Sequence, residues 1–153
     1  MQTPQEIESP AWERLDEARI LYENKKFDGA FYLAGYAVEL VLKVRICDLF
    51  NIPHLFEESG QSINNITGIS ELRRSVKIHN LQILLVYSGL KKEFDIKVRD
   101  DPDFEIINSL LIQKWSEQSR YHLTGTIPPP IIQQVLELLG NRERGILQWL
   151  LDK

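Results

Sequence analysis

Two charged residues stand inside an otherwise apolar stretch of the sequence. Glu39 and Lys43 are four residues apart, in the order that favours an ion pair along a helix. Burying a charged side chain is costly unless it is paired, so both residues need a specific partner. They form a structural ion pair, or one of them pairs with Arg120, or they contact a ligand bound inside the fold. The sequence leaves these three interpretations open.

A second group of polar residues follows Trp115. It is the run Arg120-Tyr121-His122. In one interpretation the run forms an edge that binds phosphate or nucleotide, with arginine supplying charge and tyrosine a ring for stacking. In the other, Arg120 caps the carboxyl end of a helix and Tyr121 is buried up to its hydroxyl group.

The histidines do not form a catalytic or metal-binding pattern. His54, His79 and His122 are far apart, and the sequence has no phosphate-binding loop, dinucleotide fingerprint, Gly-x-Ser-x-Gly elbow or His-Glu-x-x-His motif. Cys47 is the only cysteine, which excludes an intramolecular disulfide and a cysteine-rich zinc site. We expect no metal and no cofactor. His79 is expected to cap a helix or pack beneath a loop, since a catalytic role needs a base or phosphate partner.

Composition places the chain among folded globular proteins. Of its 153 residues, 43% are hydrophobic and 26% are charged, which fits one domain with a real core. The net charge of −4 means that any contact with nucleic acid must come from a local patch. The segment 1–9 has no apolar signal region, and the uncharged stretch 29–38 is too short to cross a bilayer. We therefore expect a cytoplasmic protein with no membrane contact.

The segment 28–50 is expected to be a central helix. Its apolar residues cover nearly all sides instead of forming a stripe, so other helices must surround it. Small residues around Gly35 allow a neighbouring backbone to approach closely. Together with Tyr32 and Tyr36 they are expected to serve packing, including the seam of a dimer.

The other segments are assigned from caps, glycines and apolar spacing. In chain order they are a first helix from Ser9-Pro10 to Asn24, a loop over 54–68, one or two helical turns over 69–76, a third helix from His79-Asn80 to Ser88-Gly89, a charged connector over 91–100, a fourth helix from Asp101-Pro102 to about Ser119, a stiff spacer at 128–130 and a fifth helix with a bend at Gly140.

These elements predict an all-α protein, an up-and-down bundle of four or five helices. It forms a single domain over 1–153, with a core of about 9–122 and a C-terminal helix of about 130–151. The apolar residues of 138–151 are expected to include surface that docks on a second subunit.

Three features, in this order, give the sequence a family resemblance. They are the apolar helix Gly29–Lys43, the triplet His79-Asn80-Leu81, and Trp115 followed by Arg120-Tyr121. In that order they resemble the HEPN family of small helical-bundle proteins, whose members show an A-x-x-L-A-x-x-A-V-E-x-x-L-K helix, a His-Asp/Asn-Leu and a terminal Arg-Tyr. The likeness runs from the first helix to Tyr121. It implies a bundle of four or five helices, commonly dimeric and often encoded with a small nucleotidyltransferase.

The resemblance also implies a catalytic possibility. Some members cut RNA without a metal, using an Arg-x(4–6)-His motif at a dimer cleft. There an arginine holds the scissile phosphate and a histidine moves the proton of the attacking 2′-hydroxyl. In this sequence Arg120 and His122 have one residue between them, whereas Arg74 and His79 have four. The catalytic candidates are thus Arg74, His79, Arg120 and His122.

The leading hypothesis from the sequence is a HEPN-type homodimer that is non-catalytic or only weakly catalytic. It binds a nucleotide, an RNA or a nucleotidyltransferase partner in a toxin–antitoxin-like or stress-response system. Its ligand-binding residues are Arg120, Tyr121, Glu39, Lys43 and Tyr36. A metal-independent endoribonuclease is the first alternative, and a purely structural oligomerisation module is the second.

Overall fold

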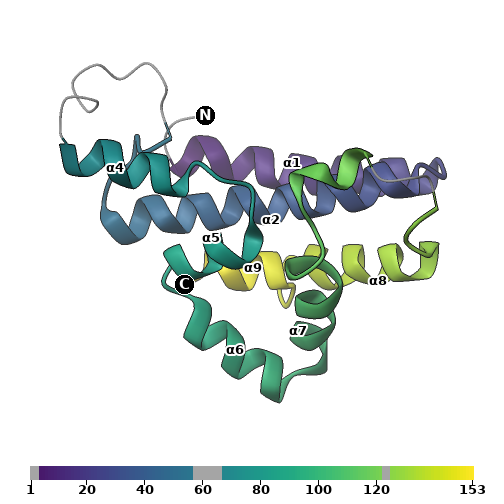
Figure 1. The fold of residues 1–153 in the computed structure, drawn as a ribbon. Helices are drawn as coiled ribbons and strands as arrows, with labels where there is room; N and C mark the ends of the chain where they lie inside the picture. Colours follow the sequence, from purple (N-terminus) through teal and green to yellow (C-terminus); the bar gives the residue numbers. More distant parts are fainter. Residues whose placement is uncertain (1–3, 57–66, 122–124) are drawn as a thin grey trace.

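All regular secondary structure in the described residues is helical. The computed structural model describes residues 4–56, 67–121 and 125–153, and in these ranges it has no strand (Figure 1). The prediction of an all-α protein is confirmed. The elements are α1 Pro4–Glu23, α2 Phe27–Phe50, α4 Thr67–Val76, α5 Leu81–Tyr87, α6 Lys91–Asp100, α7 Pro102–Ile107, the π-helix η1 Asn108–Ile112, the 3₁₀-helix η2 Glu117–Tyr121, α8 Pro129–Gly140 and α9 Ile146–Leu151.

Helix α2 lies at the centre of the fold, as its all-round apolar sequence predicts. It runs beside α1 along most of its length, and α8 and α9 lie below it in the view of Figure 1. Helix α5 and η2 pack on it as well. Every side of α2 therefore meets another element, and its residues from Ala30 to Cys47 are mostly buried. The left-handed backbone of Asn51 ends the helix at the expected break.

Helix α1 starts earlier than the sequence predicts. It begins at Pro4, so the Ser9-Pro10 pair is inside the helix and does not start it. A proline there removes one backbone hydrogen bond, which is a cost. Ile7 is only 2% exposed, however, and its burial in the core stabilises the additional turns.

The segment 91–100 is a helix, and the prediction of a connector is wrong. Phe94 of α6 is 1% exposed and packs against the rings of Phe104 and Trp149, with ring centroids 5.7 and 6.3 Å away. The exposed side of the helix is charged and carries a Lys91–Asp95 ion pair. One buried aromatic residue is enough to dock this short helix, although it gives only a weak apolar pattern.

The fourth predicted helix begins where expected but does not stay α-helical. Asp101 caps α7 by accepting a hydrogen bond from the backbone N–H of Asp103 at 2.9 Å. The chain then passes into the π-helix η1, which the backbone N–H of Gln113 closes by donating to the carbonyl of Asn108 at 3.0 Å. Trp115 follows and is 4% exposed.

The C-terminal region holds two helices where the sequence predicts one. The residues of the expected spacer begin α8, because a proline in the first helical turn lacks only a backbone N–H that has no partner there. The expected bend is a turn over 141–145, in which the Asn141 side chain accepts hydrogen bonds from the backbone N–H groups of Glu143 and Arg144 at 2.9 Å. With α6 also helical, the described residues form eight α-helices where four or five were expected.

The apolar residues of the C-terminal region are not spare surface. Leu139, Ile146, Leu147 and Leu150 are at most 2% exposed and belong to the same core as α2. The expectation that this segment offers surface for a second subunit is corrected for these four residues. None of the described helices is both long and apolar enough to cross a membrane.

Candidate functional site

The carboxylate of Glu39 is buried at the middle of α2. Glu39 is 1% exposed, and the Lys43 ammonium group donates a hydrogen bond to its Oε1 atom at 2.7 Å. Lys43 is itself only 12% exposed. The two residues are one helical turn apart and form the ion pair that a buried charge requires.

His79 is the second partner of the same carboxylate. Its Nδ1 atom lies 3.0 Å from Glu39 Oε1 and 3.1 Å from Oε2. Of the two roles that the sequence leaves open for His79, capping the next helix is wrong. Asn80 caps it, since its Oδ1 accepts a hydrogen bond from the backbone N–H of Ile83 at 3.0 Å. His79 is thus placed just outside α5, where its ring can reach α2.

The contact with Glu39 determines how the imidazole ring is used. A carboxylate can only accept hydrogen bonds, so Nδ1 must carry the proton and donate it to Glu39. In the neutral ring Nε2 is then left as an acceptor. It points toward η2, where Glu117 Oε2 lies 3.7 Å away. The side chain of His79 as a whole is 45% exposed.

A pocket of about 280 Å³ opens beside this cluster. Tyr36, Phe56 and Lys77 line it together with Glu39, Lys43 and His79. The Lys43 ammonium group lies 5.4 Å from the centre of the Phe56 ring. Burial raises the pKa of the Tyr36 hydroxyl above its ordinary value, and the negative charge of Glu39 raises it further. The hydroxyl group is therefore a hydrogen-bond donor at neutral pH.

Trp115 attaches the segment that carries η2 to α2. Its indole Nε1 donates a hydrogen bond to the carbonyl of Tyr32 at 2.9 Å, and the two rings stack with centroids 5.8 Å apart. The indole lies directly over Gly35, where a Cβ atom would be 2.1 Å from the ring. Only glycine fits at this position. The close contact at Gly35 is thus made by the Trp115 side chain, whereas the sequence predicts the approach of a neighbouring backbone.

We expect Gly35→Ala to lower the free energy of unfolding by about 1–3 kcal/mol, because the added methyl group must displace the indole of Trp115. Urea denaturation followed by tryptophan fluorescence measures this change. Gly68→Ala is the matched control, since nothing lies within 4 Å of the added Cβ atom there. Equal stability of the Gly35 variant and the wild type would contradict the described packing of the Trp115 indole on Gly35.

The other predicted site residues are placed less closely to the cluster. Tyr121 is 68% exposed at the end of η2, so it is not buried up to its hydroxyl group. Arg74 is 77% exposed and pairs with Glu71 at 3.3 Å on the outer side of α4. Arg120 belongs to η2, but its side chain and the whole of His122 lie outside the described part of the structure.

Sequence reasoning did not identify Glu117 or Lys77 as part of the site. Both follow or precede a recognised motif by two residues, but neither shows a pattern of its own. Within the described residues, no group of three or more histidine, cysteine, aspartate or glutamate side chains could hold a metal ion. Cys47 is buried, and burial raises the pKa of its thiol to about 11, so it stays protonated and unreactive at neutral pH.

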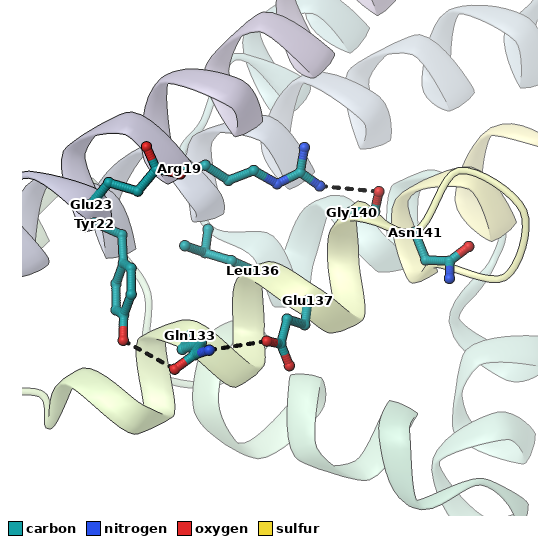
Figure 2. A pocket seen from close by; sticks show the side chains of 8 residues that line it. All are labelled: Arg19, Tyr22, Glu23, Gln133, Leu136, Glu137, Gly140 and Asn141. Atoms are coloured by element: carbon teal, nitrogen blue, oxygen red, sulfur yellow. Dashed lines mark hydrogen bonds between the residues drawn. The ribbon is translucent and has the colours of Figure 1, made fainter.

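A larger pocket of about 560 Å³ lies between α1 and α8 (Figure 2). Its polar side chains bond to one another: Tyr22 donates to Gln133 at 3.2 Å, and Gln133 donates to Glu137 at 3.1 Å. At the other end Arg19 donates to the carbonyl of Gly140 at 3.1 Å. Because these groups form hydrogen bonds with one another, two of them between α1 and α8, we interpret the pocket as part of the packing between the two helices. The buried charge and the histidine are at the smaller pocket.

Comparisons with family models, with curated proteins and with solved structures find no match to this chain. The resemblance to the HEPN family therefore stays a prediction, and it rests on the three sequence motifs.

Proposed function

We propose that this chain is a HEPN-type binding domain that holds a nucleotide or RNA where α2, His79 and η2 meet. The observation that supports the proposal is the convergence of the three motifs. The motifs are far apart in the sequence, yet His79 contacts Glu39 of the first motif. Its Nε2 atom also lies 3.7 Å from Oε2 of Glu117, a residue of the third motif's segment, which runs from Trp115 to Tyr121. In this proposal the chain is a dimer, with a nucleotidyltransferase as its partner in a two-component, toxin–antitoxin-like or stress-response system.

The chemistry of the surface fits a phosphate-bearing, aromatic ligand. Lys43 and Lys77 line one pocket, and their ammonium groups can donate hydrogen bonds to phosphate oxygens. Because Lys43 already neutralises Glu39, the buried carboxylate repels an anion less than its formal charge indicates. The exposed ring of Tyr121 offers a face on which a base can stack.

A titration with mononucleotides and short single-stranded RNAs tests the proposal. We expect Tyr121→Ala to weaken RNA binding about tenfold, since stacking of one base contributes about 1–3 kcal/mol. Arg120→Ala is expected to weaken it too. Arg99→Ala is the matched control for charge, because Arg99 is exposed on α6 and pairs only with its neighbour Asp100 among the described residues. Fluorescence anisotropy measures the affinities.

Two results would count against this binding surface. One is the absence of any RNA or nucleotide binding by the folded protein. The other is equal affinity of the wild type, Tyr121→Ala and Arg120→Ala, which would remove η2 from the site. A loss of affinity in Arg99→Ala as large as in Arg120→Ala would indicate a general effect of charge.

A second candidate function is a metal-independent endoribonuclease. The observation that favours it is the orientation of His79, whose Nδ1 donates to a buried carboxylate while Nε2 faces η2 on a side chain that is 45% exposed. A histidine held in this way can take a proton from a 2′-hydroxyl group. An RNA-cleavage assay in EDTA separates the two functions: cleavage that His79→Ala abolishes supports the enzyme, and no cleavage by the wild type supports the binding domain.

A further inference from the structure

A third, more apolar pocket of about 260 Å³ lies away from the Glu39 cluster. Phe31 of α2, Leu110 of η1 and Ile131 of α8 contribute apolar side chains, and Ile127 and Pro128 complete the apolar lining. Phe31 is only 3% exposed, so this part of the lining belongs to the protein core. Small-molecule sites in proteins are typically concave and mostly apolar, with a few placed polar groups. This pocket has that character and is slightly smaller than a drug-sized site.

The walls of the pocket are held in place by local structure. The backbone N–H of Gly125 donates to Asp28 Oδ2 at 3.1 Å, which ties the segment before α8 to the start of α2. Gly125 adopts a φ of +85°, which favours glycine over other residues. Pro128 then has a fixed φ and leads directly into α8.

The opposite wall contains the π-helix η1. Leu110 lies within it, and π-turns are rare and frequently found at functional sites. The wider turn is closed by the hydrogen bond from Gln113 to Asn108 described above. The irregular helix and the pocket therefore occur at the same place in the fold.

Lys114 follows the π-turn and lines the same pocket. It is exposed, and its ammonium group makes no hydrogen bond or ion pair with another residue of the described ranges. Within the part of the chain that the structure describes, no ion pair compensates this positive charge at the border of the apolar pocket. This charge selects the kind of ligand, since an apolar molecule with a negative head group matches both features.

We propose that this pocket binds a small aliphatic carboxylate, with its hydrocarbon chain against Phe31, Leu110 and Ile131 and its carboxylate on the ammonium group of Lys114. The site is independent of the surface proposed for RNA or nucleotide. It shares no lining residue with the pocket at Glu39.

A series of straight-chain carboxylates from butanoate to decanoate tests this proposal, with the primary alcohols of equal length for comparison. Calorimetry measures binding to the full chain. We expect the affinity to rise by about fourfold for each buried methylene group and to level off once the pocket is full. Each carboxylate is expected to bind about two- to fivefold more tightly than its alcohol, because the pair with Lys114 is exposed to solvent.

Variants connect the binding to these residues. Lys114→Gln should reduce carboxylate affinity to that of the alcohol and leave the alcohol unchanged, whereas Lys92→Gln, the same change at an exposed lysine of α6, should alter neither. Ile131→Trp should fill the pocket and abolish binding. Absence of binding, affinities that do not depend on chain length, or equal binding of carboxylate and alcohol by the wild type would each overturn the proposal. If Ile131→Trp fails to fold, the comparison of Lys114→Gln with Lys92→Gln and the series of carboxylates still test the proposal.

Discussion

Replacing Glu39 with alanine is expected to lower the free energy of unfolding by about 3–5 kcal/mol, because two polar partners lose the carboxylate that they share. Lys43 would keep a positive charge that is only 12% exposed, and Nδ1 of His79 would lose its acceptor. An uncompensated buried charge costs far more than an intact pair contributes. Urea denaturation of the wild type and of Glu39→Ala at pH 7 measures the difference.

A double variant serves as the matched control for this prediction. Glu39→Leu combined with Lys43→Met removes both charges and keeps apolar side chains at both positions. Replacing a buried ion pair by apolar residues of similar volume is often neutral or stabilising, so the double variant should recover most of the stability lost in Glu39→Ala. A double variant as unstable as the single one would show that the unpaired lysine is not the cause.

The same double variant decides between the interpretations that the sequence leaves open for Glu39 and Lys43. If the pair were purely structural, a stable double variant would bind RNA or nucleotide as the wild type does. We expect weaker binding, because Glu39 also orients His79, with the Nδ1 atom 3.0 Å from its carboxylate. Restored stability with reduced affinity would separate the two roles.

The parts of the fold that the sequence predicts well are those with a strong local cause. Helix α2 is apolar on all sides, and this feature requires enclosure whichever partners surround it. The starts of α5 and α7 depend on the short-range caps Asn80 and Asp101, whose side chains accept hydrogen bonds from backbone N–H groups two or three residues later. Such contacts can be read from a few neighbouring residues.

The errors occur where one tertiary contact outweighs the local pattern. Helix α6 is mostly charged, and Phe94, packed among other aromatic rings, is its one buried residue. The early start of α1 depends on Ile7, which is buried although it lies in a polar segment. At the end of α8, the Arg19 guanidinium from a distant helix occupies the space next to Gly140. None of these contacts involves residues close together in the sequence.

The sequence predicts some members of the candidate site but not their arrangement. Glu39, Lys43 and His79 stood out from the sequence, and so did the need for a specific partner. That His79 is this partner could not be foreseen, because it is 40 residues from Glu39 and joins a different element. Glu117 has no pattern of its own, and only the fold brings it within 3.7 Å of His79.

The enclosure of α2 makes a strong prediction about two leucines of the same helix. Leu42 is 0% exposed, whereas Leu49 is 56% exposed. Leu42→Ala is expected to lower the free energy of unfolding by about 2–5 kcal/mol, through lost apolar contacts and the cavity that remains. Leu49→Ala should change it by less than about 0.5 kcal/mol, as is usual for surface positions.

Comparing the two variants separates the effect of side-chain burial on the free energy of unfolding from the effect of helix propensity. Both replace leucine by alanine in α2, so the gain from the higher intrinsic preference of alanine is similar in each and cancels in the difference. Chemical denaturation with a common slope gives the two free energies. Since α1, α5, α8, α9 and η2 all pack on α2, a small effect at Leu42 would mean that these elements do not enclose it. Such a result would also argue against the packing of Trp115 on Gly35 and the contact of His79 with Glu39, because both depend on the position of α2.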